Sequence, residues 1–521
     1  MDHKSDDDSD GLQCKDLESR PWPERPPQLS VINFRTTQPD QALIDNDNEQ
    51  HTSPSNVSSS IPTPVRTQFI MSMCRSLDAK SRSFLPQSYI DTITPHLVKG
   101  ELNKAMPTLS ESVLDNYTAR VLGVASNNAT DQERRSYKLS LESRLVKTFA
   151  ILVLIGKVET LPSFLASGFA DSLLPIVNAH VQHENTWRCF DKWTIPSIEA
   201  FIETQWVVLS PFLSAPITDV SLYNFPTQII LPILEDDPAT TPPVKFGGYS
   251  TVRKIRIHHR HHDFGENQDN PYFALKKLRS QHMEDFQREV AALRPFVVLP
   301  HHHIVKLLAA FRHDDSFYLL FPWAEAGSLH TFWKENPRPI PTVSLSRWIS
   351  EQCLGIATAL GQIHHGHDSL VTDSSSYCGR HGDIKPSNIL LFQKDTPESN
   401  FVWALSDFGL GKLNHHTEKR GDRPVGFSPT YRAPELDLKG EINSAYDIWS
   451  LGCVFLELLT WVSCGWEGVQ SFALSRVDID QRSSKVGERD DGFFSITARQ
   501  GGLSGARLKN GVSLVSLHSH E

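Results

Sequence analysis

The sequence predicts an α+β protein in which a small β-rich lobe is followed by a larger helical lobe, with an all-α region in front of both. Three observations predict this order. Apolar residues recur at helical spacing in the first half of the chain, strand-like segments begin near position 246, and helical segments dominate beyond 340. A β-rich lobe next to a helical lobe leaves a cleft between the two.

The chain is long enough for two or three domains and is mildly acidic. It has 521 residues and a formal net charge of −10 at pH 7, and no basic stripe is visible. We therefore expect no nucleic-acid partner. The seven cysteines are scattered and form no C-x-x-C pair, which indicates reduced thiols in an intracellular compartment.

Apolar runs in the sequence are short. The best one, 149–156, lies between Lys147 and Lys157 and falls well short of the roughly 20 residues that a bilayer needs. The N-terminus is acidic and polar and has no apolar core of a signal peptide. We therefore expect no membrane span and an intracellular protein, cytoplasmic or nuclear, that is not secreted.

Composition divides the chain into four parts. Residues 1–66 are rich in Asp, Ser, Pro, Gln and Asn and are expected to be a disordered acidic and polar tail. Residues 67–235 are expected to be a helical region, and 236–243 a linker that contains several prolines. Residues 244–521 hold the β-rich and helical lobes, and the larger lobe looks incomplete at its C-terminus.

The helical region carries no sign of chemistry. Leu141, Leu145 and Phe149 recur at helical spacing, and prolines separate the later apolar blocks. We find no metal-ligand spacing, nucleophile motif or phosphate loop there. Binding of a protein partner is therefore the default hypothesis for 67–235.

The β-rich lobe is predicted element by element. A strand-turn-strand segment covers 246–257 and a further strand covers 272–278, because both are rich in β-branched and aromatic residues. A helix is predicted at about 282–293. Two more strands are expected near 304–312 and 317–321.

Three segments of this lobe place residues suited to nucleotide phosphates. Gly247 and Gly248 precede Ser250 and Val252 in the first hairpin, and glycines let backbone amides approach phosphate oxygens. Two adjacent glycines alone are usually just a turn. The strand at 272–278 then presents a lysine, Lys276, and the helix after it presents a glutamate.

The larger lobe contains the stronger signals. Residues 381–391 read His-Gly-Asp-Ile-Lys-Pro-Ser-Asn-Ile-Leu-Leu, and Asp407-Phe408-Gly409 follows after a polar stretch. Residues 428–435 read Ser-Pro-Thr-Tyr-Arg-Ala-Pro-Glu, and Asp447 opens a further helix. Carboxylate and amide oxygens such as these are the ligands that Mg²⁺ prefers.

These segments, in this order, resemble the eukaryotic protein kinase family. The family patterns are G-x-G-x-x-G-x-V, V-A-I-K, H-R-D-L-K-P-x-N, D-F-G and A-P-E, and the resemblance covers roughly 240–470. It implies a bilobal protein kinase fold and transfer of the γ-phosphoryl group of ATP to hydroxyls of a protein substrate, with ATP and Mg²⁺ as cofactors.

The resemblance also implies roles for residues of the small lobe and the connection after it. Gly247, Gly248, Ser250 and Val252 would cover the phosphates. Ala274 would face the adenine, and Lys276, paired with Glu289, would hold the α- and β-phosphates. The Pro322 carbonyl and the Ala324 N–H would bind the adenine edge.

In the larger lobe, Asp383 would act as the base for the acceptor hydroxyl, and Lys385 would neutralise charge on the migrating phosphoryl group. Asn388 and Asp407 would bind Mg²⁺, and Leu390 would form the floor of the adenine pocket. Asp447 would brace the catalytic loop. Lys385 together with a serine at 428 resembles the serine/threonine class.

Departures from the family pattern keep an alternative open. Lys245 and Ser250 stand where the pattern has glycines, Gly382 stands where many members have an arginine, and the family's last helices are not recognisable after Trp461. The alternative is a catalytically impaired pseudokinase, or a truncated kinase, that acts as a binding module. The His-Gly-Asp triplet and the run 465–469 resemble kinases of filamentous fungi.

Overall fold

The computed structural model describes residues 63–77, 81–124, 144–177, 186–234, 245–246, 250–264, 271–280, 282–365, 378–393, 401–408, 412–414, 428–438, 442–479, 489–498 and 504–513. The chain divides into two units. Unit 1 comprises 1–212 and 224–235, and unit 2 comprises 213–223 and 236–521. The predicted tail lies outside the described residues up to position 62, and the predicted linker lies entirely outside them.

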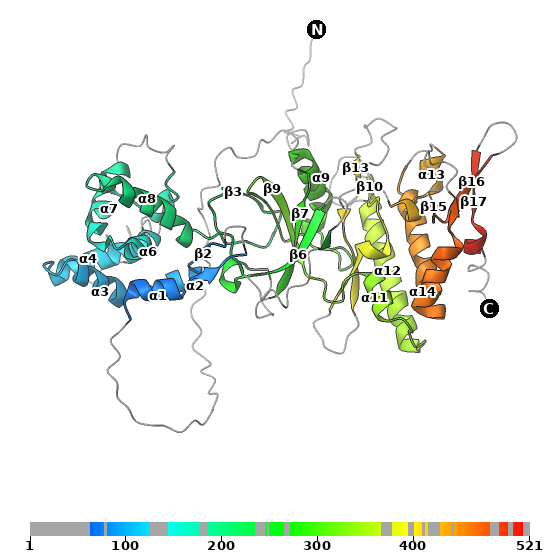
Figure 1. Cartoon of the computed structure of the whole chain (residues 1–521), viewed down its shortest axis with the longest axis horizontal. Helices are drawn as coiled ribbons and strands as arrows, with labels where there is room; N and C mark the ends of the chain where they lie inside the picture. Colours follow the sequence, from blue (N-terminus) through cyan, green and yellow to red (C-terminus); the bar gives the residue numbers. More distant parts are fainter. Residues whose placement is uncertain are drawn as a thin grey trace, which may run out of the picture. The chain divides into compact units, whose positions relative to one another are not determined.

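Unit 1 is mostly helical, as expected (Figure 1). Its helices are α1 (Val65–Met71), α2 (Gln87–Asp91), α3 (Pro95–Ala105), α4 (Glu111–Leu122), α6 (Val146–Ile155), α7 (Leu161–Ser167) and α8 (Ile195–Thr204), joined by the 3₁₀ turns η3 (Val158–Thr160), η4 (Asp171–Leu173), η6 (Thr186–Phe190) and η7 (Gln205–Val208). The structure adds the antiparallel pair of β1 (Cys74–Arg75) and β2 (Ser83–Phe84). Strands this short carry no alternation that a sequence pattern could indicate. Strand β4 (Ile233–Leu234) also belongs to this unit, and β3 (Leu222–Phe225) spans its boundary.

Helix α6 is the apolar centre of unit 1. Its residues from Thr148 to Leu154 are all buried, as expected for a helix that is apolar on every side. The Asp171 carboxylate accepts from the N–H groups of Lys147 and Thr148 at 2.8 Å each, which satisfies donors of the first turn. Gly156, at φ 69°, ends the helix in the left-handed conformation.

The small lobe of unit 2 is an antiparallel sheet, seen in green in Figure 1. Its strands pair in the order β5-β6-β7-β9-β8. They are β5 (Lys245–Phe246), β6 (Ser250–Ile257), β7 (Tyr272–Leu278), β8 (Ala309–His313) and β9 (Ser316–Pro322), with turn η8 (His259–His261) after β6 and helices α9 (Met283–Leu293) and α10 (Pro295–Val298) after β7. Helix α9 packs on the sheet through Phe286, whose ring stacks on Phe317 at 4.7 Å.

These elements confirm the predicted strands and helix of the small lobe with one shift. The strand expected at 304–312 begins only at Ala309. Its first part pairs elsewhere, because the Val305 N–H donates to the Leu405 carbonyl at 2.9 Å. Residues 304–305 therefore connect the small lobe to the larger one.

The described part of the larger lobe contains several helices and several two-stranded sheets. The helices are α11 (Leu329–Glu335), α12 (Val343–His365), α13 (Pro434–Asp437) and α14 (Ala445–Ser475), with turns η9 (Pro386–Asn388) and η11 (Pro429–Tyr431). The strand pairs are β10 (Cys378–Arg380) with β13 (Lys412–Asn414), β11 (Ile389–Phe392) with β12 (Val402–Leu405), β14 (Asp478–Ile479) with β15 (Arg489–Asp490), and β16 (Phe494–Ala498) with β17 (Ser504–Leu508).

Helix α14 bends at Gly465. Its φ of 70° and ψ of −169° are not helical, and a Cβ there would lie 2.3 Å from the Pro337 carbonyl oxygen. Only glycine fits this position without a shift of the backbone. The Trp466 N–H donates to the same carbonyl at 2.8 Å, so the bend fastens α14 to the chain just after α11.

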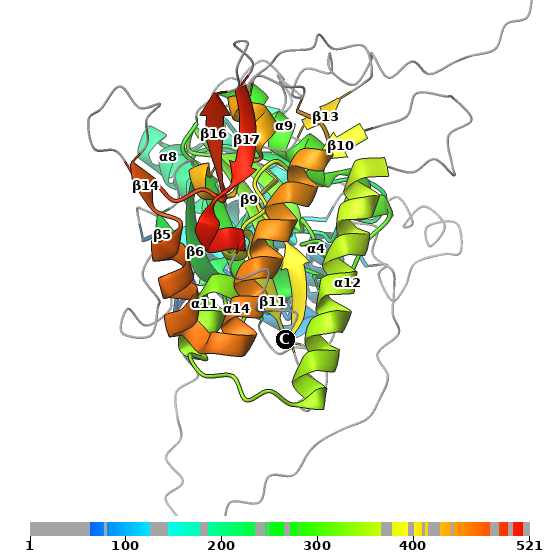
Figure 2. The ribbon, with the colours of Figure 1, turned by 90° about the vertical axis from the view of Figure 1, so that its right-hand side faces the viewer.

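The C-terminal part differs from the expectation of polar loop after Trp461. Helix α14 continues to Ser475, and the hairpin β16–β17 packs against it (Figure 2). Phe493 and Val512 are buried in one cluster with Cys453 and Phe472 of α14. The C-terminal segment therefore packs on α14 through this buried cluster.

Candidate active site

Lys276 joins three elements of unit 2. It lies on β7, opposite Val252 of β6, and its ammonium donates to Glu289 Oε1 of α9 at 2.5 Å and to Asp407 Oδ1 at 2.8 Å. The side chains of Lys276 and Glu289 are 10% and 7% exposed, whereas that of Asp407 is 47% exposed. The cluster is thus closed on the small-lobe side and open at Asp407.

The charges of this cluster support one another. Burial lowers the pKa of the Lys276 ammonium, but the carboxylates of Glu289 and Asp407 outweigh burial and raise the pKa above its usual range. Burial likewise raises the pKa of the Asp407 carboxyl, but the charge and hydrogen bond of Lys276 outweigh it and lower that pKa. Lys276 is therefore cationic and Asp407 ionised at neutral pH.

Asp407 also has an unusual backbone. Its φ of 66° lies in the left-handed region, which residues other than glycine seldom adopt. Such conformations cost free energy and are concentrated at functional sites. The lysine contact and the paired strands before it hold Asp407 in this conformation.

The Asp383 carboxylate accepts three hydrogen bonds from side chains of the larger lobe. Lys385 Nζ donates to Oδ2 at 2.7 Å and Asn388 Nδ2 to Oδ2 at 2.9 Å, while the Ser428 hydroxyl donates to Oδ1 at 2.7 Å. Lys385 Nζ also donates to Ser428 Oγ at 2.7 Å. Because a carboxylate can accept about four hydrogen bonds, Asp383 retains one position for a further hydroxyl.

Asp447, buried at the start of α14, fixes the backbone around Asp383. Its carboxylate accepts from the N–H groups of His381 and Gly382 at 2.8 Å each, and it lies 2.9 Å from His364 Nε2. His381 Nδ1 accepts from the Asp383 N–H at 3.3 Å, so its Nε2 carries the proton that faces the Ser406 carbonyl at 3.1 Å.

The two clusters meet along β11 and β12. These strands pair with Ile389 opposite Leu405. Beyond that pair, the Ser406 N–H and hydroxyl both donate to the Asn388 carbonyl at 2.9 Å. Asn388, which bonds Asp383, therefore lies beside Ser406, whose neighbour Asp407 bonds Lys276.

The residues expected to hold Mg²⁺ have suitable oxygen atoms. Asn388 uses Nδ2 for Asp383, which leaves Oδ1 as the amide atom available to a cation. Asp407 adds a half-exposed, ionised carboxylate. Since Mg²⁺ is commonly bound by one or two protein carboxylates together with substrate phosphates, Asn388 and Asp407 fit the metal when a nucleotide supplies the remaining oxygens.

The residues expected around adenine lie on the facing strands and the connection after β9. Ala274 is paired with Phe321, and Pro322 with Phe273. Ala324 is buried, and Leu390 is half-buried. In the first hairpin, Ser250 is buried and Val252 is half-buried on β6, whereas Gly247 and Gly248 lie outside the described residues.

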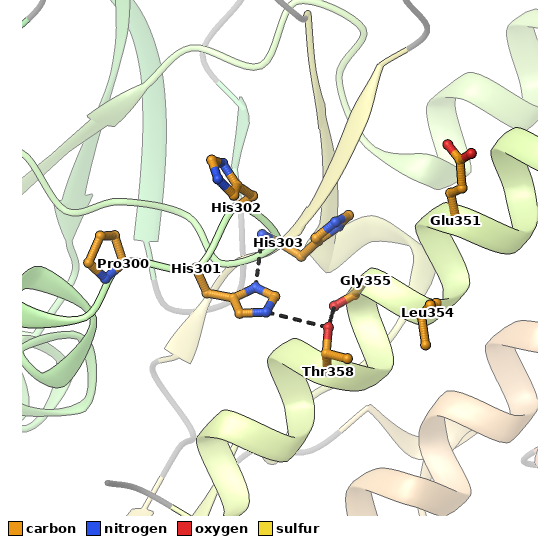
Figure 3. A pocket seen from close by; sticks show the side chains of 8 residues that line it. All are labelled: Pro300, His301, His302, His303, Glu351, Leu354, Gly355 and Thr358. Carbon is orange, nitrogen blue, oxygen red and sulfur yellow. Dashed lines mark hydrogen bonds between the residues drawn. The ribbon is translucent and has the colours of Figure 1, made fainter. Parts of the chain in front are cut away.

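A separate hollow of about 380 Å³ contains none of the predicted site residues. It is lined by the loop 300–303 and by residues of α12 (Figure 3). His303 Nδ1 lies 2.7 Å from the Trp403 carbonyl, so this imidazole has a structural partner. Among the described residues, no group of three or more His, Cys, Asp or Glu side chains could hold a metal.

Sequence reasoning missed the position of Ser428. We used this serine to assign a class, but its hydroxyl contacts both Asp383 and Lys385. The spacing to these partners spans 45 and 43 residues, so no local pattern indicates the contact. Ser428 thus belongs to the same cluster as the expected catalytic residues.

Comparison with known proteins agrees with this geometry. The family model described as "Protein kinase domain" matches residues 247–487. This match, together with the two lobes, confirms the predicted fold class: unit 2 has the bilobal protein kinase fold.

Two of the similar proteins are receptor kinases of a plant. The chain is 30% identical over 193 residues to a probable LRR receptor-like serine/threonine-protein kinase of Arabidopsis thaliana, covering 36% of this chain and 32% of that protein. It is 34% identical over 200 residues to an L-type lectin-domain containing receptor kinase of the same plant, covering 37% of this chain and 26% of that protein. The chain thus spans about a quarter to a third of the length of these relatives, of which the first is named a serine/threonine-protein kinase and the second a receptor kinase.

Two further expectations, on the group of kinases that the chain resembles and on its location in the cell, are not confirmed as the fold class is. The named relatives do not address the resemblance to filamentous-fungal kinases, which stays a prediction. The expectation of an intracellular protein without a membrane span is wrong on these findings. The relatives are named receptor kinases, and α14 is long and apolar enough to cross a membrane, although half of its most apolar stretch is buried inside the unit and a core helix meets the same test.

Proposed function

We propose that this protein transfers the γ-phosphoryl group of ATP to serine or threonine hydroxyls of a protein substrate. The observation that carries the proposal is the connected cluster in which Lys276 bonds Asp407 at 2.8 Å while Asp383 accepts from Lys385 at 2.7 Å. Phosphoryl transfer needs little covalent chemistry from a protein and depends on positioned charges and an aligned acceptor.

The proposed roles follow from the contacts. Lys276, held by Glu289, would orient the donor phosphates, and Lys385 would offset negative charge that develops on the transferred group. Asp383, with one hydrogen-bond position left, would accept the hydrogen of the substrate hydroxyl and orient it for attack. Mg²⁺, bound by Asn388 and Asp407, would bridge and neutralise phosphate oxygens.

The roles expected at the adenine and phosphate cover belong to the same proposal. Ala274 and Leu390 would line the adenine, and the Pro322 carbonyl and Ala324 N–H would bind its edge. Gly247, Gly248, Ser250 and Val252 would cover the phosphates. A protein partner for unit 1 is a further part of the proposal.

The test compares the full-length protein with Asp383→Asn in transfer of labelled γ-phosphate to casein. Because the amide cannot take the proton, we expect transfer to fall by roughly 10² to 10⁴-fold. Asp315→Asn is the matched control, since Asp315 lies in the β8–β9 turn with its side chain 86% exposed, and it should leave transfer unchanged.

The same experiment distinguishes the proposed active kinase from the alternative, a pseudokinase or truncated kinase. Nucleotide binding by the folded wild-type protein, with no transfer to any protein, would contradict the proposal and favour a pseudokinase that acts as a binding module. Equal transfer by the wild type and Asp383→Asn would contradict the role of Asp383.

A further inference from the structure

An acidic turn in the C-terminal segment contacts the loop next to Asp383. This acidic turn comprises residues 490–492 between β15 and β16, and it lies beyond the residues 247–487 that the kinase family model matches. The loop that it contacts, residues 428–432, is called the acceptor loop here, since Ser428 at its start bonds Asp383.

The first contact fixes the end of the acceptor loop. Arg432 Nη1 and Nη2 donate to the two carboxylate oxygens of Asp490 at 3.1 Å each, and its Nε donates to Asp437 at 2.9 Å. Arg432 Nη1 also donates to the Pro429 carbonyl inside the same loop. Paired, planar contacts of this kind restrict orientation as well as distance.

The second contact lies in the middle of the acceptor loop. The Thr430 hydroxyl is 2.8 Å from both carboxylate oxygens of Asp491. Asp491 is itself held from α14, because Arg476 Nε donates to its carbonyl at 3.3 Å. Thr430 and Asp491 are only half-buried, so this contact can be removed without opening the core.

The two contacts bear on the position of Ser428. Thr430 follows Ser428 by two residues and lies inside the turn η11 (Pro429–Tyr431). Neither residue can therefore move far without the other. A loop held at Thr430 and Arg432 therefore keeps the Ser428 hydroxyl 2.7 Å from Asp383 Oδ1 and from Lys385 Nζ. Displacing the acceptor loop would disturb Asp383, the proposed base, at the point where the hydroxyl of a protein substrate must align.

We propose that Asp491, supported by Asp490, is a positioning residue that holds the acceptor loop against Asp383 and so sets how well a protein hydroxyl is aligned. This inference rests on the proposed kinase function. It predicts that the acidic turn affects use of the protein substrate but not of ATP, because neither Asp491 nor Thr430 contacts Lys276 or Asp407 among the described residues.

The test measures kcat and KM of the full-length protein for casein and for ATP in five variants. Asp491→Ala and Thr430→Val should each lower kcat/KM for casein by roughly tenfold, since small misplacement of a reacting group is costly, with KM for ATP unchanged. The double variant should be no worse than either single one. Asp491→Asn keeps an oxygen acceptor for Thr430 and should restore most of the activity.

The fifth variant, Thr497→Val, is the matched control. It removes a hydroxyl that donates to the Gly505 carbonyl at 3.3 Å within the hairpin β16–β17, away from the acceptor loop, and it should leave both substrates unaffected.

Each outcome decides the inference. Wild-type kinetics in Asp491→Ala, or an equal loss for ATP and casein, would overturn it while the proposed function stands. Failure of Asp491→Asn to recover activity would overturn it too. A wild-type protein without any transfer would instead refute the proposed function, and the inference with it.

Discussion

Two clusters of charged side chains in the described part of unit 2 differ in their exposure to solvent. The groups around Lys276 and Asp383 in the active site together form the first cluster, which is open because the Asp407 side chain is 47% exposed. The second cluster, around Arg476 in the C-terminal part, is closed: Arg476 is 1% exposed and its partner Glu457 is 6% exposed. Both clusters cost desolvation, but only the open one can exchange an internal contact for a ligand.

The closed cluster takes most of its partners from within the fold, although Arg476 Nη1 is buried without a hydrogen-bond partner among the described residues. Arg476 Nη2 donates to Glu457 at 2.8 Å, and the Arg476 guanidinium lies between the rings of Phe472 and Phe493 at 4.2 and 4.0 Å. Lys509 Nζ donates to two backbone carbonyls, at 2.6 and 2.7 Å. A buried ion pair with this many partners fixes a structure, so we assign the closed cluster to folding and the open one to chemistry.

The largest expected effect on stability comes from breaking the closed cluster. Arg476→Met leaves Glu457 buried without its cation, which should lower the free energy of unfolding by about 3 to 5 kcal/mol. Urea denaturation measures this change. Arg507→Met, at an exposed position on β17, is the control and should stay within about 0.5 kcal/mol of the wild type. An equal loss in both variants would contradict the assignment.

Breaking the open cluster should act mainly on activity. Lys276→Met removes the ammonium that would bind the phosphates, and we expect transfer to casein to fall by roughly 10² to 10³-fold. Lys277→Met, its exposed neighbour on β7, should retain activity. If Lys276→Met lost stability as severely as Arg476→Met while keeping its activity, the division between the two clusters would be wrong.

The smallest expected effect is a pH dependence at the edge of the closed cluster. Burial raises the pKa of the Asp490 carboxyl, but hydrogen bonds from Arg432 and Gly492 outweigh burial and lower the pKa below its usual range. A carboxyl with a lower pKa in the folded chain stabilises the fold above its unfolded pKa of about 3.9, and this stabilisation is lost as the pH falls through the folded value.

The wild type should therefore lose free energy of unfolding more steeply below about pH 5 than Asp490→Asn does. Urea denaturation at a series of pH values measures the two slopes. Identical slopes would show that Asp490 contributes nothing to the acid sensitivity of the fold.

The two clusters also differ in how far the sequence predicts them. Lys276, Glu289, Asp383, Asn388 and Asp407 were named from short patterns, and the structure brings them together. The Lys276–Glu289 contact forms over a separation of only 13 residues. Local spacing carries this information because each residue sits at a fixed place on its strand, helix or loop.

The closed cluster was not predicted, because its partners lack any local spacing. Arg476 and Glu457 are 19 residues apart, and Lys509 and Arg476 are 33 apart. The bend of α14 at Gly465, which has a left-handed φ, was not predicted either. Long-range pairing of ordinary charged residues leaves no periodic pattern in a sequence.

The central claim is that the open cluster acts as one unit on one magnesium-bound triphosphate. It is tested most directly by single-turnover transfer of the γ-phosphate from Mg-ATP to casein. The transfer is measured in the wild type, in Asp383→Asn, in Asp407→Asn and in the double variant. The account predicts active wild-type protein, large losses in both single variants, and a double variant little worse than the poorer single one, because residues that act as a unit are not additive. Additive losses, or wild-type activity in either single variant, would contradict it.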